Sequence, residues 1–135
     1  MSTGLRNTRI LVVDDDADTR DLLQVVLQQA GAEVVPAESV DAAVEVFRHA
    51  PPHIVVSDIR LRSSDGFELM KAIRENNKEY RGYTPAVAIT GFSSPGDRER
   101  ALAAGFNAYI VKPFDPSEIV TTIATLISEA GEGAA

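Results

Sequence analysis

Short apolar runs, each followed by a polar residue, constrain the fold of this chain more than any other feature. They are rich in β-branched residues, which is typical of strands covered on both faces of a sheet. Four such runs lie at Arg9–Val13, His53–Ser57, Ala86–Ile89 and Tyr109–Val111. A fifth strand is predicted at Glu33–Ala37, where Pro36 indicates an edge position because proline cannot donate to a sheet ladder.

Segments with apolar residues at helical spacing separate these runs. The first predicted helix ends at Gly31 and buries Leu22, Leu23, Val26, Leu27 and Ala30. The second follows a cap at Ser39, ends before Pro51 and buries Val40, Ala43, Val44 and Phe47.

Three more helices are predicted in the second half of the chain. One follows a cap at Asp65 and buries Leu69, Met70 and Ile73. A long connection over Glu75–Pro85 is expected to follow it. A short helix over about Gly96–Ala104 ends at Gly105. The last helix follows a cap at Asp115 and buries Ile119, Ile123, Leu126 and Ile127.

The regular alternation of strands and helices predicts an α/β fold. Such a pattern implies βαβ units with right-handed crossovers and a parallel sheet between two helix layers. The length of 135 residues fits a single domain over residues 1–135. We expect an ordered core over about residues 9–129 and flexible ends, because the first eight residues are polar and the last five are rich in Gly and Ala.

Composition narrows the function classes. The formal net charge of −7 and the pI near 4.7 argue against direct binding to nucleic acid. The chain has no cysteine, which excludes disulfides, thiol nucleophiles and thiolate metal ligands. We find no signal peptide and no apolar stretch long enough to span a bilayer, so we expect a cytoplasmic protein without a membrane role.

The residues at the strand ends point to a functional site. Asp14 and Asp15 follow the first strand, Asp58 the third, Thr90 the fourth and Lys112 the fifth. The carboxyl ends of parallel strands meet at one edge of a sheet, where ligands bind in open α/β folds. Converging carboxylates repel one another unless a cation is bound, and oxygen ligands suit Mg²⁺. The set therefore predicts a site for a metal ion and a phosphoryl group, with Lys112 and Thr90 as donors to the anion.

At this point the sequence resembles the receiver domains of response regulators in two-component phosphorelay systems. The motifs that carry the resemblance are Leu11–Asp15, Asp58, Asp65-Gly66, Thr90-Gly91 and Lys112-Pro113-Phe114, within a match over about Arg9–Ile127. The resemblance implies a flavodoxin-like, doubly wound, five-stranded parallel sheet in the order 2-1-3-4-5, with five helices on both faces.

The resemblance also implies roles for individual residues. Asp58 would be the phosphoacceptor, which makes the chain a phosphoprotein that carries an aspartyl phosphate. Mg²⁺, or Mn²⁺ in its place, would be held by Asp14, Asp15, Asp58 and the backbone carbonyl of Arg60. Thr90 and Lys112 would bind the phosphoryl oxygens, and Thr90 and Tyr109 would form the switch.

Three further expectations follow from the same family. The Lys112–Pro113 peptide would be cis. Arg60 and Phe92 would tune the lifetime of the phosphoryl group. Leu61 and Arg62 replace the usual Met-Pro of the family, and this change also bears on that lifetime.

The expected partners follow from this chemistry. A sensor histidine kinase or a histidine phosphotransfer protein would donate the phosphoryl group. A downstream protein would contact the fourth helix, fifth strand and fifth helix, and signal transduction would proceed through these contacts. The chain would be no enzyme beyond its own phosphorylation and slow autodephosphorylation.

Two alternatives stay open at this point. The chain could be a receiver-like interaction module that does not use phosphorylation. It could also be a receiver domain excised from a hybrid histidine kinase, because the segment Arg81–Pro85 is similar to the connection found in such receivers.

Overall fold

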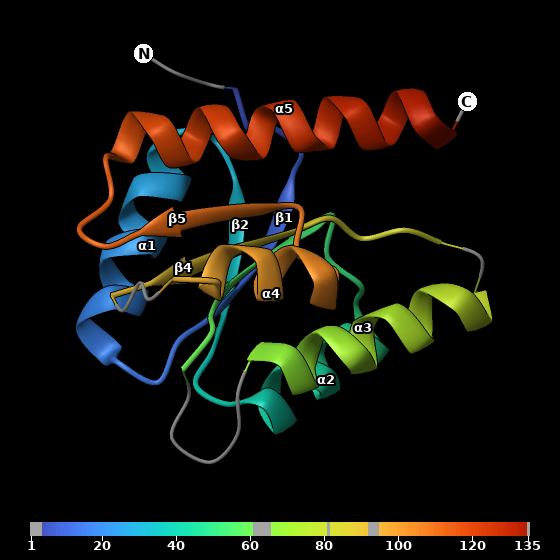
Figure 1. The fold of residues 1–135 in the computed structure, drawn as a ribbon. Helices are drawn as coiled ribbons and strands as arrows, with labels where there is room; N and C mark the ends of the chain where they lie inside the picture. The colour runs from blue at the N-terminus through green and yellow to red at the C-terminus, as the bar shows by residue number, and fades with distance from the viewer. Residues whose placement is uncertain (1–3, 61–65, 81, 92–94, 135) are drawn as a thin grey trace.

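Five strands alternate with five helices in the computed structural model, which describes residues 4–60, 66–80, 82–91 and 95–134 (Figure 1). The elements are β1 (Arg9–Val13), α1 (Ala17–Gln29), β2 (Glu33–Ala37), α2 (Val40–His49), β3 (Ile54–Asp58), α3 (Gly66–Tyr80), β4 (Ala86–Thr90), α4 (Asp97–Ala104), β5 (Ala108–Val111) and α5 (Pro116–Ala134). None of the helices in these described ranges combines the length and apolarity that crossing a membrane requires.

The sheet is parallel and has the order β2-β1-β3-β4-β5. This confirms the predicted α/β fold class and the doubly wound strand order. The edge position predicted from Pro36 is also confirmed, because β2 pairs only with β1 among the described strands. The order reverses between β1 and β3, so the carboxyl ends of these two strands flank the point where such folds place their ligands.

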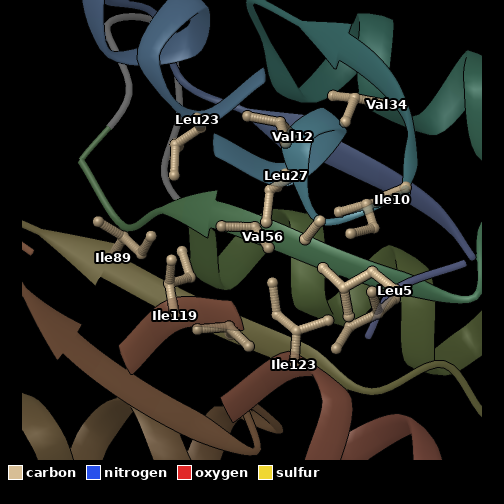
Figure 2. Close-up of a cluster of buried hydrophobic side chains, with 14 of the residues drawn as sticks. Leu5, Ile10, Val12, Leu23, Leu27, Val34, Val56, Ile89, Ile119 and Ile123 are labelled. Carbon is tan, nitrogen blue, oxygen red and sulfur yellow. The ribbon is translucent and has the colours of Figure 1, made fainter. Parts of the chain in front are cut away.

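Alternation along the strands divides the core between the two faces of the sheet. In β1, Ile10 and Val12 belong to one cluster, whereas Leu11 and Val13 belong to the other. Helices α1 and α5 cover the first face, which Figure 2 shows in close-up. The labelled side chains there are Leu5, Ile10, Val12, Leu23, Leu27, Val34, Val56, Ile89, Ile119 and Ile123.

Helices α2, α3 and α4 cover the opposite face. The buried helix residues of this second cluster are Val40, Ala43, Phe47, Leu69, Met70, Ile73 and Ala101. Several strand residues beneath them are small, including Ala86 and Ala88 of β4. Small side chains on this face leave room for three helices to approach the sheet closely.

Helix α3 corrects the predicted connection over Glu75–Pro85. The helix continues to Tyr80 because Asn77 extends its buried stripe one turn beyond Ile73. Asn77 is only 8% exposed. Its side-chain Nδ2 donates to the hydroxyl of Thr84, and its Oδ1 accepts from the backbone N–H of Thr84. A polar residue at an inward position broke the apolar pattern on which the sequence prediction depended.

Arg74 of α3 ties three segments together at the amino-terminal edge of β4 and β5. Its guanidinium donates to Asn77 Oδ1 at 2.8 Å, to the backbone carbonyl of Thr84 at 2.7 Å and to that of Gly105 at 2.6 Å. The guanidinium carbon also lies 4.4 Å from the centre of the Tyr83 ring. Gly105 admits this contact, because a Cβ there would lie 3.0 Å from Arg74 Nε.

The flexibility expected of the two ends stays a prediction, but the core begins before residue 9 and one predicted core residue needs correction. Leu5 is fully buried in the first core cluster, and its amide donates to the carbonyl of Ala30 at 3.0 Å. At the other end, α5 continues to Ala134. Leu22 was expected inside but is 52% exposed, because α1 turns Leu23 and Leu27 toward the sheet and Leu22 away from it.

Candidate functional site

Polar side chains from separate strands meet at the carboxyl edge of the sheet. Asp14 follows β1, Asp58 ends β3, Thr90 ends β4 and Lys112 follows β5. Parallel pairing aligns these ends, and the amide of Lys112 donates to the carbonyl of Thr90 at 2.8 Å. The fold thus brings together residues that lie up to 98 positions apart in the chain.

The ammonium of Lys112 bridges two buried carboxylates. Its Nζ lies 3.0 Å from Asp14 Oδ2 and 2.9 Å from Asp58 Oδ2. The side chains of Asp14 and Asp58 are only 2% and 11% exposed, and that of Lys112 is 21% exposed. Such partly buried ion pairs are screened much less than surface pairs.

Backbone N–H groups hold the other oxygen of each carboxylate. The amide of Asp16 donates to Asp14 Oδ1 at 2.9 Å, and that of Arg60 donates to Asp58 Oδ1 at 3.0 Å. Each carboxylate is therefore fixed from two sides, by one amide and by the shared ammonium. Asp58 presents a carboxylate of defined orientation at the surface of the site.

Burial sets the electrostatics of this group. Desolvation raises the pKa of Asp14 above its ordinary value, although hydrogen bonds from Asp16 and Lys112 oppose the change. Burial alone would lower the pKa of Lys112. Its hydrogen bonds and charge interactions with Asp58 and Asp14 outweigh that effect and raise the pKa instead. Lys112 is thus held in its charged form between the two acids.

Thr90 and Tyr109 lie on the same face of adjacent strands. Tyr109 pairs in register with Ala88, and Thr90 follows Ala88 by two residues, which returns it to the same side of the sheet. Thr90 is 1% exposed, whereas Tyr109 is partly buried against the second core cluster. This arrangement places both predicted switch residues on the face covered by α2, α3 and α4.

The oxygen donors of this edge fit a hard divalent ion. Mg²⁺ usually takes one or two carboxylates and keeps several waters, which suits the Asp14–Asp58 pair. Over residues 4–60, 66–80, 82–91 and 95–134, no group of three or more Asp, Glu or His side chains is arranged to hold a metal ion. The predicted role of Asp15 as a ligand stays a prediction.

Other predicted features are placed as follows. The Lys112–Pro113 peptide is cis. Arg60 is exposed and lies two residues after the end of β3. Phe92, Leu61, Arg62 and the predicted cap Asp65 lie outside the described residues.

Sequence reasoning missed the role of Gly66 beside the end of β3. A Cβ at this position would lie 3.0 Å from both the carbonyl oxygen of Asp58 and the Cα of Ile59. The amide of Gly66 also donates to the carbonyl of Ile59 at 2.7 Å. Only glycine lets the start of α3 approach the end of β3 this closely. The Asp65-Gly66 motif was visible in the sequence, but this close approach was not.

A second missed residue is Arg20 of α1. Its Nη1 donates to the backbone carbonyl of Asp14 at 2.7 Å. The signal that could have found it is a basic residue in the first turn of a helix, where a positive charge is disfavoured.

Comparison with known proteins defines the class to which this fold and site belong. The family model described as the response regulator receiver domain matches residues 10–124. The chain belongs to the response regulator receiver domain family, whose members are parts of signalling proteins in two-component systems.

Individual relatives support this assignment. An uncharacterized 14.6 kDa protein in the sodA1 3′ region of Leptolyngbya boryana is 44% identical over 115 residues, which are 84% of this chain and 86% of that protein. The transcriptional regulatory protein ResD of Bacillus subtilis is 33% identical over 125 residues, which are 93% of this chain and 50% of ResD. The chain therefore spans about half the length of ResD.

A solved structure shows the same fold. The chemotaxis protein CheY4 of Vibrio cholerae superposes with a TM-score of 0.80 at 30% sequence identity, over 87% of this chain and 97% of that one.

Proposed function

We propose that this chain is a phosphoacceptor switch, in which Asp58 receives a phosphoryl group from a phosphohistidine. The donor would be a sensor histidine kinase or a histidine phosphotransfer protein. The observation that carries the proposal is the Lys112 ammonium, which lies 2.9 Å from Asp58 Oδ2 at the carboxyl edge of the sheet. A positive charge beside a fixed carboxylate is what phosphoryl transfer requires, because its catalysis consists largely of positioning and charge stabilisation.

The residues of the site would each contribute to that transfer. The backbone amide of Arg60 holds Asp58 Oδ1, so Oδ2 is the oxygen that faces Lys112. Attack of Asp58 on the phosphorus forms one O–P bond while the P–N bond to the donor histidine breaks. Lys112 would then donate to the phosphoryl group, and the buried Thr90 hydroxyl would donate to it from the neighbouring strand.

Magnesium is the metal that these donors suit. Asp14, Asp15, Asp58 and the carbonyl of Arg60 would hold it. When bound, it would neutralise charge on the phosphoryl oxygens and on the acidic side chains. Lys112 offsets part of the negative charge of Asp14 and Asp58 before any metal binds.

The proposed output is a change in protein contacts at α4, β5 and α5. Phosphorylation would shift an existing equilibrium on the face that carries Thr90 and Tyr109. We further propose a cytoplasmic location, because cytoplasmic kinase domains hold the donor histidine.

Phosphorylation of the purified chain tests the proposal directly. Incubation with acetyl phosphate and MgCl₂, followed by intact-protein mass spectrometry, should add one phosphoryl group. The Asp58→Asn variant should add none, since an amide is no nucleophile for this transfer. Asp41→Asn removes an exposed carboxylate from α2 and should behave as the unchanged protein does.

Two results would overturn the proposal. One is the absence of any added phosphoryl group, and the other is modification that persists in Asp58→Asn. The first result would favour the alternative of an interaction module that does not use phosphorylation, whereas the second would place the phosphoacceptor at another residue. Omission of MgCl₂ or addition of EDTA should abolish the modification if the proposed metal takes part.

A further inference from the structure

Arg20 occupies a position in α1 that disfavours its charge. It lies in the first turn, where its amide donates to the carbonyl of Asp16, the residue that caps the helix. The positive end of the helix dipole lies here, so cations are destabilising at this position.

The guanidinium of Arg20 is directed back at the site. Its Nη1 donates at 2.7 Å to the carbonyl of Asp14, one residue beyond the end of β1. Asp14 is 1% exposed, so its backbone lies out of water and its carbonyl requires a donor. Arg20 supplies that donor from a helix that begins three residues further along the chain.

Every other polar group of Asp14 is also held. Its amide donates to the carbonyl of Ala37 at 3.1 Å, Asp16 holds Oδ1 and Lys112 holds Oδ2. The bond from Arg20 therefore fixes the remaining group, which is the carbonyl of the peptide that joins Asp14 to Asp15. Because a peptide unit is planar, the orientation of that carbonyl also sets the direction in which the chain enters Asp15.

We propose that Arg20 is a positioning residue for the magnesium site, which orients Asp15 through the Asp14–Asp15 peptide. This inference rests on the proposed function, because it assigns a role to Asp15 as a ligand. Arg20 itself touches neither metal nor phosphoryl group. Its contribution is the geometry of the acidic pair before the metal arrives.

Geometry and charge predict opposite effects, which makes the inference testable. If Arg20 acts through its charge alone, its removal takes a cation away from a cation site, and Mg²⁺ should bind more tightly. If Arg20 positions Asp15, its removal should weaken Mg²⁺ binding. Changes to residues that orient metal ligands typically cost roughly 10–100-fold in metal affinity.

Isothermal titration with MgCl₂ alone should separate the two effects. We expect Arg20→Met to raise the Kd for Mg²⁺ by about tenfold or more. Arg20→Lys keeps a donor and should restore most of the affinity. Arg98→Met is the matched control, because Arg98 is an exposed arginine in the first turn of α4, and its loss should leave the Kd unchanged.

A second measurement follows the peptide itself in the absence of metal. Loss of the bond from Arg20 should shift the ¹³C signal of the Asp14 carbonyl and the ¹⁵N signal of the Asp15 amide. The shifts should be present in Arg20→Met and absent from Arg98→Met. Circular dichroism of each variant verifies that the fold is intact.

Three outcomes have distinct meanings. Tighter or unchanged Mg²⁺ binding by Arg20→Met, or unchanged signals of the Asp14–Asp15 peptide, overturns the positioning role while the proposed function stands. An absence of Mg²⁺ binding in the unchanged protein overturns the proposed metal site and the role of Arg20 together. Weaker binding with shifted signals, restored by Arg20→Lys, supports the inference.

Discussion

Replacement of Lys112 by methionine tests the electrostatic description of the site. Methionine keeps much of the apolar stem but removes the ammonium that Asp14 and Asp58 share. Their Oδ2 atoms each lie within 3.0 Å of the same nitrogen, so they are no more than about 6 Å apart. At an effective dielectric constant of about 20, two unit charges at that separation repel each other by about 3 kcal/mol.

We therefore expect Lys112→Met to lower the free energy of unfolding by about 3 kcal/mol at pH 7 without metal, which is within the range for breaking a buried pair. Urea denaturation in EDTA measures this difference. Lys78→Met, which removes an exposed lysine from α3, should change stability by less than about 0.5 kcal/mol. Addition of Asp14→Asn to Lys112→Met should recover most of the loss, because one of the two charges is then absent.

The pH dependence gives an independent prediction. The pKa of Asp14 is already raised above its ordinary value of 3.8 by burial. Stability linked to such a group is complete below pH 3.8 and is lost as the pH rises through the folded-state pKa. Removal of the ammonium should raise this pKa further, so the loss caused by Lys112→Met should be smaller at pH 5 than at pH 7.

In the unchanged protein the raised pKa of Lys112 makes the free energy of unfolding depend on pH in the alkaline range. Its contribution to stability is complete below its ordinary pKa of 10.5 and is lost as the pH rises through the higher folded-state value. The reasoning would be refuted if Lys112→Met unfolded at the urea concentration of the unchanged protein at both pH 5 and pH 7.

Two further predictions concern packing. Leu5→Ala should lower the free energy of unfolding by about 2–5 kcal/mol in urea denaturation, because the side chain is fully buried; a loss below about 1 kcal/mol would show that Leu5 adds little to the core. Gly66→Ala should lower the free energy of unfolding by about 1–3 kcal/mol, because the added Cβ would lie 3.0 Å from the backbone at Asp58. It should also slow labelling by acetyl phosphate. An unchanged labelling rate together with an unchanged urea midpoint would contradict the close approach described for α3.

The strands, the edge position of β2 and the edge at which the strand-end residues gather could be predicted from local patterns, whereas the full strand order came from the resemblance to receiver domains. Apolar runs that end in Asp14, Asp58 and Thr90 identify three strands and place their termini at one edge. Pro36 identifies an edge strand because proline has no N–H to donate to a neighbouring strand, and this property is visible in the sequence.

The features that could not be predicted depend on contacts between distant segments. From the sequence alone, Asn77 indicates a loop because it is polar. Its buried position in α3 is explained only by the two hydrogen bonds between its side chain and Thr84. Leu5 lies in a polar stretch, and only its contact with Ala30 and the core explains its burial. The bridging position of Lys112 likewise depends on how three strand ends come together in space.

The hydrogen bonds of Arg74 should couple local unfolding of the two loops that precede β4 and β5. One guanidinium joins α3 to the backbone before β4 and to the backbone before β5. Separation of α3 from the loop before β4 breaks the bond to Thr84, and separation from the loop before β5 breaks the bonds to Gly105 and Asn107. Ala86 and Asn107 are also joined directly, because the amide of Asn107 donates to the carbonyl of Ala86 and the amide of Ala86 donates to Asn107 Oδ1. The amide hydrogens of these two residues should therefore exchange with solvent water in one shared opening event.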